Sequence, residues 1–463
     1  MTFEMKGDFS MRTKHKVDMT QGRIAPLVLR FALPLCLGSV LQQMYSTVDT
    51  LVVGNFCSPV SLAALGTSGQ PIELLLLLLM GISSGVSILV AQYTGSGDDR
   101  SLRVTVDTAV SFLYMAAVPL TVVGIFIGPM ILRLMQVPPD AYPYARSYIM
   151  IFLSGTLASM GYNMNAGILR GLGDSQSSLL FLAISCVLNI VLDLLFVAWL
   201  GMDVAGAALA TVIAQFVSWA CTIIYIKTRY PELEFSFLPR RVDRDALRSL
   251  MRVGIPLGIN QSFYSVGHLL MQSLINAQGS LFIAACAVGS KLAGIANMMI
   301  ASLSQAAATY SAQNYGAKKY DRVRRGIVIP FISGGITLAA SIVMLLLARP
   351  LLGLFTDDPQ VLELSLTYLG LLQPFTCCYA VFNGIINIVH GIGEMRYPTI
   401  VNVLMLWGVR IPVGHLIANV FGGYYVSAAI SVSFIFGLTC MLIYLRGHRW
   451  REIGMLAKRQ AME

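Results

Sequence analysis

Residues 178–200 read SLLFLAISCVLNIVLDLLFVAWL, and this run decides the class of fold. A helix needs about 20 mainly apolar residues to cross a bilayer, and this run is long enough. Its only charged side chain is Asp193, and Asn189 precedes it by four residues, so the two share one helix face. An acid inside a membrane costs at least about 2.5–3.5 kcal/mol, so this pair is a candidate functional site.

Similar apolar runs fill the chain of 463 residues, which is 56% hydrophobic and only 12% charged. Soluble domains carry about 25% charged residues, so most soluble enzyme folds, disordered chains and fibres are excluded. We predict an all-α membrane protein with twelve transmembrane helices. The expected spans are 24–50, 61–93, 105–132, 142–168, 176–200, 204–227, 247–275, 281–312, 326–348, 362–389, 398–420 and 424–446.

The basic residues predict the orientation of these spans. With the N-terminus in the cytoplasm, 27 of the 32 lysines and arginines fall in the tails and inner loops. Basic residues accumulate on the cytoplasmic side, so we expect a multi-pass protein of the cell inner membrane with both termini inside. The net charge of +9 then points to the anionic bilayer surface and not to nucleic acid as a partner.

The chain also repeats itself with an offset of about 220 residues. The stretch RGLGD at 170–174 matches HGIGE at 390–394, and AQYTG at 91–95 matches AQNYG at 312–316. Each repeat holds six spans, so both have the same orientation, and a pseudo-two-fold axis should follow the membrane normal. We predict two six-helix lobes, residues 1–228 and 247–463, joined by a cytoplasmic linker at 229–246. Two such lobes are typical of a transporter that rocks around a central cavity.

The first lobe contains a set of oxygen-bearing side chains suited to a monovalent cation. Asp49 lies in the outer half of the first span, and Thr211 in the sixth span is able to reach the face of Asn189 and Asp193. Oxygen ligands suit a hard cation such as sodium, whereas two close carboxylates can also hold a proton. We therefore expect a coupling site for a proton or a sodium ion here, and no other cofactor.

The second lobe lacks this set. The repeat places Met271, Arg410, Gly414 and Val432 at the positions of Asp49, Asn189, Asp193 and Thr211. A cation site of this kind is therefore expected in the first lobe alone.

Two further charges stand inside predicted spans. Glu73 follows Pro71 in the second span, and Lys291 lies in the eighth, three residues before the repeat counterpart of Glu73. Glu73 could attract a cationic substrate, the two residues could pair between lobes, or both could lie near the outer interface, where charge is tolerated.

Together these features resemble the multidrug and toxic compound extrusion (MATE) family, over about residues 20–446. The motifs that carry the resemblance include Asp49-x-x-x-x-Gly54, Asn189-x-x-x-Asp193, Gln313-x-x-Gly316 and Arg410-Ile-Pro412. The resemblance implies efflux of cationic or amphipathic organic compounds, driven by inward proton or sodium flux and carried out by a monomer. It implies cation binding by Asp49, Asn189, Asp193 and Thr211. It also implies a helix bend at Pro34 and places Tyr148 and Asn163 along the first-lobe cavity.

The chain departs from one branch of that family. Transporters of the NorM type carry acids in the seventh and tenth spans, whereas here those stretches contain Asn260, Gln261 and Asn383. This difference argues against coupling in the second lobe. In this respect the chain is more similar to the DinF-like or MepA-like members. The three amides remain candidates for the substrate cavity.

Two other function classes were compared with antiport. A lipid-linked oligosaccharide flippase would share the topology but commonly has extra spans and a more cationic cavity. An intramembrane metalloprotease is not expected, because the chain has no HExxH motif. A GxxxxGK[ST] loop for ATP is absent as well.

Overall fold

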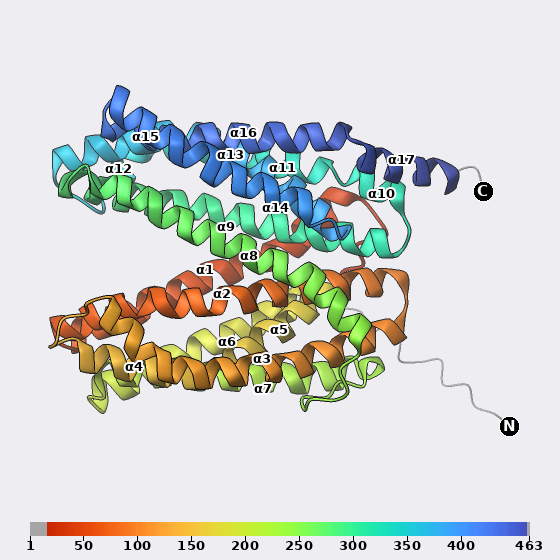
Figure 1. Cartoon of the computed structure of the whole chain (residues 1–463), viewed down its shortest axis with the longest axis horizontal. Helices are drawn as coiled ribbons and strands as arrows, with labels where there is room; N and C mark the ends of the chain where they lie inside the picture. The colour runs from red at the N-terminus through yellow and green to blue at the C-terminus, as the bar shows by residue number, and fades with distance from the viewer. Residues whose placement is uncertain (1–15, 461–463) are drawn as a thin grey trace. The chain divides into compact units, whose positions relative to one another are not determined.

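The computed structural model describes residues 16–460, and for 70–79, 448–449 and 458–459 it describes the backbone alone. Within this range the regular structure is helical, without a β-strand (Figure 1). Nine helical segments among the described residues are long and apolar enough to cross a membrane. The prediction of an all-α, multi-pass membrane protein is confirmed.

The helices of the first half of the chain follow the predicted spans in order. They are α1 (Ile24–Phe56), α2 (Pro59–Ser96), α3 (Asp99–Leu134), α4 (Tyr142–Ser154), α5 (Thr156–Leu172), α6 (Ser175–Asp193), the π-helix η1 (Leu194–Trp199), α7 (Asp203–Arg229) and the short 3-10 helix η2 (Pro231–Leu233).

The second half repeats this order with more interruptions. Its helices are α8 (Arg244–Asn276), α9 (Ser280–Gly316), α10 (Tyr320–Arg325), α11 (Val328–Leu346), α12 (Ala348–Leu352), α13 (Pro359–Gly391), α14 (Arg396–Val403), the π-helix η3 (Leu404–Arg410), α15 (Ile411–Val420), the 3-10 helix η4 (Gly423–Tyr425), α16 (Ala428–Arg446) and α17 (His448–Gln460).

The chain forms two compact units, and each contains part of a helix from the other half of the sequence. Among the described residues, unit 1 comprises 16–18 and 37–258, and unit 2 comprises 19–36 and 259–460. The first half of α8 therefore packs in unit 1, and the first half of α1 packs in unit 2. The functional lobes predicted at 1–228 and 247–463 remain a prediction.

Glycines allow the close contact between α8 and α2 in unit 1. A Cβ atom at Gly81 would lie 2.1 Å from the backbone nitrogen of Gly258, and one at Gly85 would lie 2.9 Å from Gly254 Cα. No side chain fits in either gap, because real Cβ atoms do not approach backbone so closely. The two backbones pack directly against each other at these crossings.

Packing within each unit reproduces the sequence repeat. In unit 1 a Cβ atom at Gly171 would lie 2.7 Å from the carbonyl oxygen of Ser87. In unit 2 a Cβ atom at the counterpart Gly391 would lie 2.6 Å from the carbonyl oxygen of Ala308. The same crossing therefore joins α5 to α2 and α13 to α9, and the glycine in each matched motif is required by it.

The motif at Gln313 has a structural role in unit 2. Gln313 Oε1 accepts a hydrogen bond from the Met19 backbone N–H at 3.1 Å, and Asn314 Nδ2 donates to the Met19 carbonyl at 2.9 Å. Lys319 Nζ donates to the Thr20 carbonyl at 2.9 Å. These bonds hold the segment that precedes α1.

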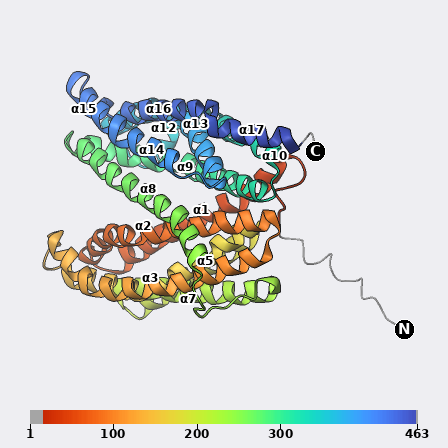
Figure 2. The ribbon, with the colours of Figure 1, turned by 45° about the vertical axis from the view of Figure 1, so that its right-hand side comes forward.

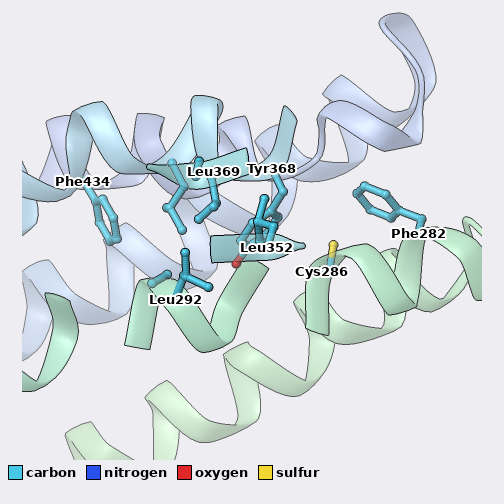
Figure 3. Close-up of a cluster of buried hydrophobic side chains, with 10 residues drawn as sticks. Phe282, Cys286, Leu292, Leu352, Tyr368, Leu369 and Phe434 are labelled. Atoms are coloured by element: carbon cyan, nitrogen blue, oxygen red, sulfur yellow. The ribbon is translucent and has the colours of Figure 1, made fainter. Parts of the chain in front are cut away.

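The core of unit 2 is a cluster of apolar side chains between α9, α12, α13 and α16. Figure 3 shows Leu292 and Cys286 on α9 facing Leu352, Tyr368 and Leu369, with Phe434 at one end. Burial of this kind contributes about 25 cal/mol per Å² of apolar surface.

Several predicted spans differ in detail from the helices of the structure. The fourth, 142–168, is two helices, because α4 ends at Ser154 and α5 begins at Thr156. The intervening Gly155 lies so close to α7 that a Cβ atom there would approach Val212 Cγ2 to 2.4 Å. The first span continues to Phe56 instead of ending at residue 50.

Candidate functional site

The four predicted coupling residues come together inside unit 1. Asp49 lies on the part of α1 that belongs to this unit, Asn189 and Asp193 lie on α6, and Thr211 lies on α7. Asn189 and Asp193 are completely buried, and Asp49 and Thr211 are 8% and 6% exposed. Two acids so enclosed require hydrogen-bond donors or a bound cation.

The Asn189 amide connects the two carboxylates. With its nitrogen toward them, it donates to Asp49 Oδ1 at 2.9 Å and to Asp193 Oδ2 at 3.3 Å. The reverse orientation would place the amide oxygen against acceptors only, so the first orientation satisfies the hydrogen bonds. The Asn189 amide oxygen then lies 3.5 Å from Thr211 Oγ1.

Tyr45 completes the network and was not among the predicted site residues. Its hydroxyl donates to Thr211 Oγ1 at 2.9 Å. Tyr45 precedes Asp49 by four residues, so the two share a face of α1. This spacing is the sequence signal that could have identified it.

The carboxyl groups of Asp49 and Asp193 share the Asn189 amide and lie close enough to interact electrostatically. Two ionised carboxylates have only acceptor oxygens, so a proton or a metal cation between them would be stabilising. Asp193 Oδ1 is buried and has no partner among the described residues. The site therefore still has an acceptor atom available for a proton or a metal cation.

The helix that carries Asn189 and Asp193 changes its winding directly after the site. α6 ends at Asp193, and the π-helix η1 begins at Leu194. Single turns of π-helix are rare and frequently occur at functional sites.

Of the two residues implied to line the first-lobe cavity, one lies near the carboxylates. Tyr148 on α4 is buried and close enough to Asp49 and Asp193 to interact electrostatically with both. Asn163 on α5 is half-buried, and its amide donates to the Ser159 carbonyl of its own helix at 2.8 Å. No contact between Asn163 and the carboxylates occurs within the described residues.

The repeat-equivalent positions in unit 2 also lie together, but their side chains differ in chemistry. A Cβ atom at Gly414 would lie 3.4 Å from Met271 Sδ, so these two positions meet just as Asp193 and Asp49 do. Arg410 is 4% exposed, donates to Ser433 Oγ at 3.0 Å and lies 5.4 Å from the ring centre of Phe434. Unit 2 therefore has a buried cation where unit 1 has its amide.

The other predicted residues are more scattered. Pro34 is buried inside α1. On α8, Asn260 is half-buried and Gln261 is exposed. Lys291 is exposed, with its ammonium 5.5 Å from the ring centre of Phe355. Glu73 lies on α2, outside the residues whose side chains are described, so the predicted pair of Glu73 and Lys291 stays a prediction.

Asn383 belongs to a short amide chain on α13. Its Nδ2 donates to Tyr379 OH at 3.1 Å, and its Oδ1 accepts from Asn387 Nδ2 at 2.8 Å. The side chain is half-buried. It is thus fixed by neighbours on its own helix.

Known proteins are similar to this chain in sequence and in fold. The chain is 26% identical to the probable multidrug resistance protein YpnP of Bacillus subtilis, covering 96% of this chain and 99% of that one. It is 29% identical to the probable multidrug resistance protein YoeA of the same organism, covering 92% and 96%.

A solved structure described as MATE in the straight conformation superposes with a TM-score of 0.88, at 22% identity, over 96% of this chain and 99% of that one. This likeness shows the fold. The MatE family model matches residues 34–195 and 256–416, which are the two halves of the internal repeat. The chain therefore belongs to the MatE family of multi-pass membrane transporters.

Proposed function

We propose that the chain is a secondary active antiporter that exports cationic or amphipathic organic compounds in exchange for protons or sodium ions. The observation that carries this proposal is the buried pair of Asp49 and Asp193, joined by Asn189 in one unit and replaced by Met271 and Gly414 in the other. Intramembrane acids that contact each other are typical of ion-coupled transport. The names of the relatives, multidrug resistance proteins, support the substrate class.

The contacts favour a proton over sodium as the coupling ion. The Asn189 amide presents its nitrogen to the carboxylates, so its oxygen is not available to a metal ion there. Two ionised carboxylates have only acceptor oxygens, so a proton between them would supply the donor that the pair lacks. Sodium would have to rotate the amide and break both of its bonds.

Ion binding would then change the balance between two arrangements of the first-half helices. A proton that enters the pair neutralises a buried charge, and its loss leaves two carboxylates in a medium of low dielectric. Pro34 in α1 removes a backbone hydrogen bond, and η1 follows Asp193, so both helices have points at which they can bend. If substrate binds one arrangement better, the ion gradient drives its release.

The proposal includes a place and an orientation. We assign the chain to the cell inner membrane, with both termini and the 229–246 linker in the cytoplasm, because the basic residues are concentrated there. One chain holds both halves of the repeat, so a monomer is sufficient for alternating access.

The test is transport by the purified chain in liposomes, with a pH gradient and a sodium gradient imposed separately. We expect ethidium movement against its gradient when the proton gradient is present, and none with sodium alone. Asp49→Asn should abolish this movement, whereas Asp140→Asn, a matched change at an exposed acid, should leave it intact.

Movement driven by sodium alone would overturn the choice of ion. Failure of the wild-type chain to move organic cations under either gradient, together with translocation of a lipid-linked oligosaccharide, would replace the antiporter by a flippase.

A further inference from the structure

A cavity of about 590 Å³ lies at one end of unit 2. Its wall is formed by the end of α9, the turn between α13 and α14, the end of α16 and the helix α17. The residues that line it are Tyr315, Ile392, Gly393, Glu394, Tyr444, Glu452, Ile453, Met455 and Leu456. Cavities that hold small organic ligands measure about 300–1,000 Å³, so its size is suitable.

The cavity is acidic and aromatic. Glu394 and Glu452 supply two carboxylates, Tyr315 and Tyr444 supply two rings, and Met455 adds a polarisable thioether. Lysine and arginine are absent from the lining described for the cavity. Carboxylates combined with aromatic faces and apolar side chains are the surroundings that an organic cation prefers.

The corresponding acid in unit 1 is enclosed by hydrogen-bond donors. Asp174, the repeat counterpart of Glu394, is completely buried. Its Oδ2 accepts from Tyr225 OH at 2.9 Å and from Tyr230 OH at 3.0 Å, and its Oδ1 accepts from the Ser177 backbone N–H at 3.0 Å. Burial and the Asp174 charge raise the pKa of Tyr230, so this hydroxyl keeps its proton and donates.

The tyrosine that contacts Asp174 in unit 1 has a counterpart, Tyr444, that lines the cavity in unit 2. Cys221-Thr-Ile-Ile-Tyr225 matches Cys440-Met-Leu-Ile-Tyr444 in sequence. Tyr444 is 8% exposed, and its hydroxyl has no hydrogen-bond partner within the described part of the chain. Its ring lies 4.8 Å from that of Tyr397, which holds it at the cavity wall. The same acid and tyrosine thus form a hydrogen bond in unit 1, whereas in unit 2 both line a cavity and Glu394 accepts from the Arg396 backbone N–H at 3.1 Å.

The helix α17 fixes the outer wall of this cavity. It lies beside α10 at the end of unit 2 (Figure 1, Figure 2). Trp450, Ile453 and Ala457 are buried on its inner face. Gly454 packs so closely on α10 that a Cβ atom there would lie 3.2 Å from the Arg324 guanidinium carbon. The packing of these residues orients Glu452 beside Tyr315, with which it interacts electrostatically.

We propose that this cavity is a second binding site, for an organic cation with an apolar body, held by Glu394, Glu452 and the rings of Tyr315 and Tyr444. The proposal rests on the proposed function in one respect, that organic cations are the compounds this chain transports. The site lies outside the helices that carry the coupling residues. It therefore captures or senses the cation and is not the place of ion exchange.

The experiment is calorimetric titration of the purified full chain with tetraphenylphosphonium, without any ion gradient. Glu394→Gln and Glu452→Gln keep the side-chain volume and remove one charge each. We expect each to raise the dissociation constant of one class of sites about fivefold, and the double variant to abolish that class. Glu363→Gln, at an exposed acid elsewhere in unit 2, is the matched control and should bind like the wild type.

The anion tetraphenylborate has the same shape and should not compete for this class of sites. We expect Asp193→Asn, which should lose antiport, to retain this class of cation sites. Cation binding and antiport are then lost in different variants, so failure of this proposal can be distinguished from failure of the proposed antiport. Unchanged binding in the double variant would overturn the proposal.

A measurement on the unaltered protein covers the case in which a variant does not fold. Carbodiimide labelling followed by peptide mass spectrometry should show that tetraphenylphosphonium protects Glu394 and Glu452 but not Glu363. Equal labelling of all three acids with and without the cation would contradict the site.

Discussion

Asn189 determines the chemistry of the candidate site, because one amide satisfies two acids. Its nitrogen donates to both Asp49 and Asp193, and its oxygen end faces Thr211. Hydrogen bonds to charged groups contribute about 1.5–3 kcal/mol, so the amide stabilises the pair without neutralising it. In the proposed mechanism, the coupling cation balances the charge that remains on the pair.

Tyr45 supports this network from α1, and its hydroxyl should matter for transport. Tyr45→Phe removes the donor to Thr211 and keeps the ring. A lost hydrogen bond of about 1 kcal/mol corresponds to a fall in transport rate of about fivefold. Initial rates of ethidium efflux in liposomes measure this. An unchanged rate would show that Tyr45 is only a packing residue.

The site could be predicted from sequence to the extent that its residues share helix faces. The spacing of Asn189 and Asp193 and the rarity of buried acids identified three of the members. Tyr45 escaped because tyrosine is common in membrane helices and its partner lies on another helix. The conformation of the Asn189 amide and the orphan Asp193 Oδ1 depend on the packing of α1, α6 and α7, which a spacing rule cannot specify.

At the scale of helices, the contact of α2 with α8 limits which side chains the fold accepts. Gly81→Ala would force a Cβ atom against the backbone of Gly258. Overpacking of this kind costs about 1–3 kcal/mol, so we expect a clearly lower thermal midpoint in detergent. Gly66→Ala, on the same helix with nothing within 4 Å of the added atom, is the control and should be neutral or slightly stabilising. Equal midpoints for the two variants would contradict this packing.

Helix boundaries were predicted less well than helix existence. Hydropathy cannot detect the break between α4 and α5, because Gly155 is set by the approach of Val212 and not by polarity. Likewise, hydropathy does not distinguish the π-helices η1 and η3 from the α-helices beside them. The exchange of α1 and α8 segments between the units arises from packing, so the sequence repeat alone placed both helices wholly in their own lobes.

At the scale of the whole molecule, the two halves share a fold but differ in chemistry. Arg410 and Met271 leave unit 2 without the acidic ligands of unit 1. Replacing Asn383 or Gln261 by Ala should therefore change the range of compounds transported and leave proton-driven efflux measurable. Efflux assays with several organic cations test this. Complete loss of coupling at normal expression would move the coupling site to the second half.

The orientation of the molecule can be tested independently of transport. A cysteine at Leu238, which is exposed in the segment between α7 and α8, should be inaccessible to an impermeant thiol reagent added to intact cells. A cysteine at Asp357, exposed between α12 and α13, should react, because that loop is expected outside. The reverse pattern would invert the topology.

The central claim is that protons and substrate exchange through the pair of Asp49 and Asp193. It is tested most directly by loading liposomes with an organic cation and following a pH-sensitive dye as the compound leaves through the purified chain. We predict that protons move in the opposite direction to the cation in the wild type, and that Asp193→Asn binds the cation but moves no protons. Proton movement by Asp193→Asn at the wild-type rate would contradict the account and leave Asp193 as a structural residue.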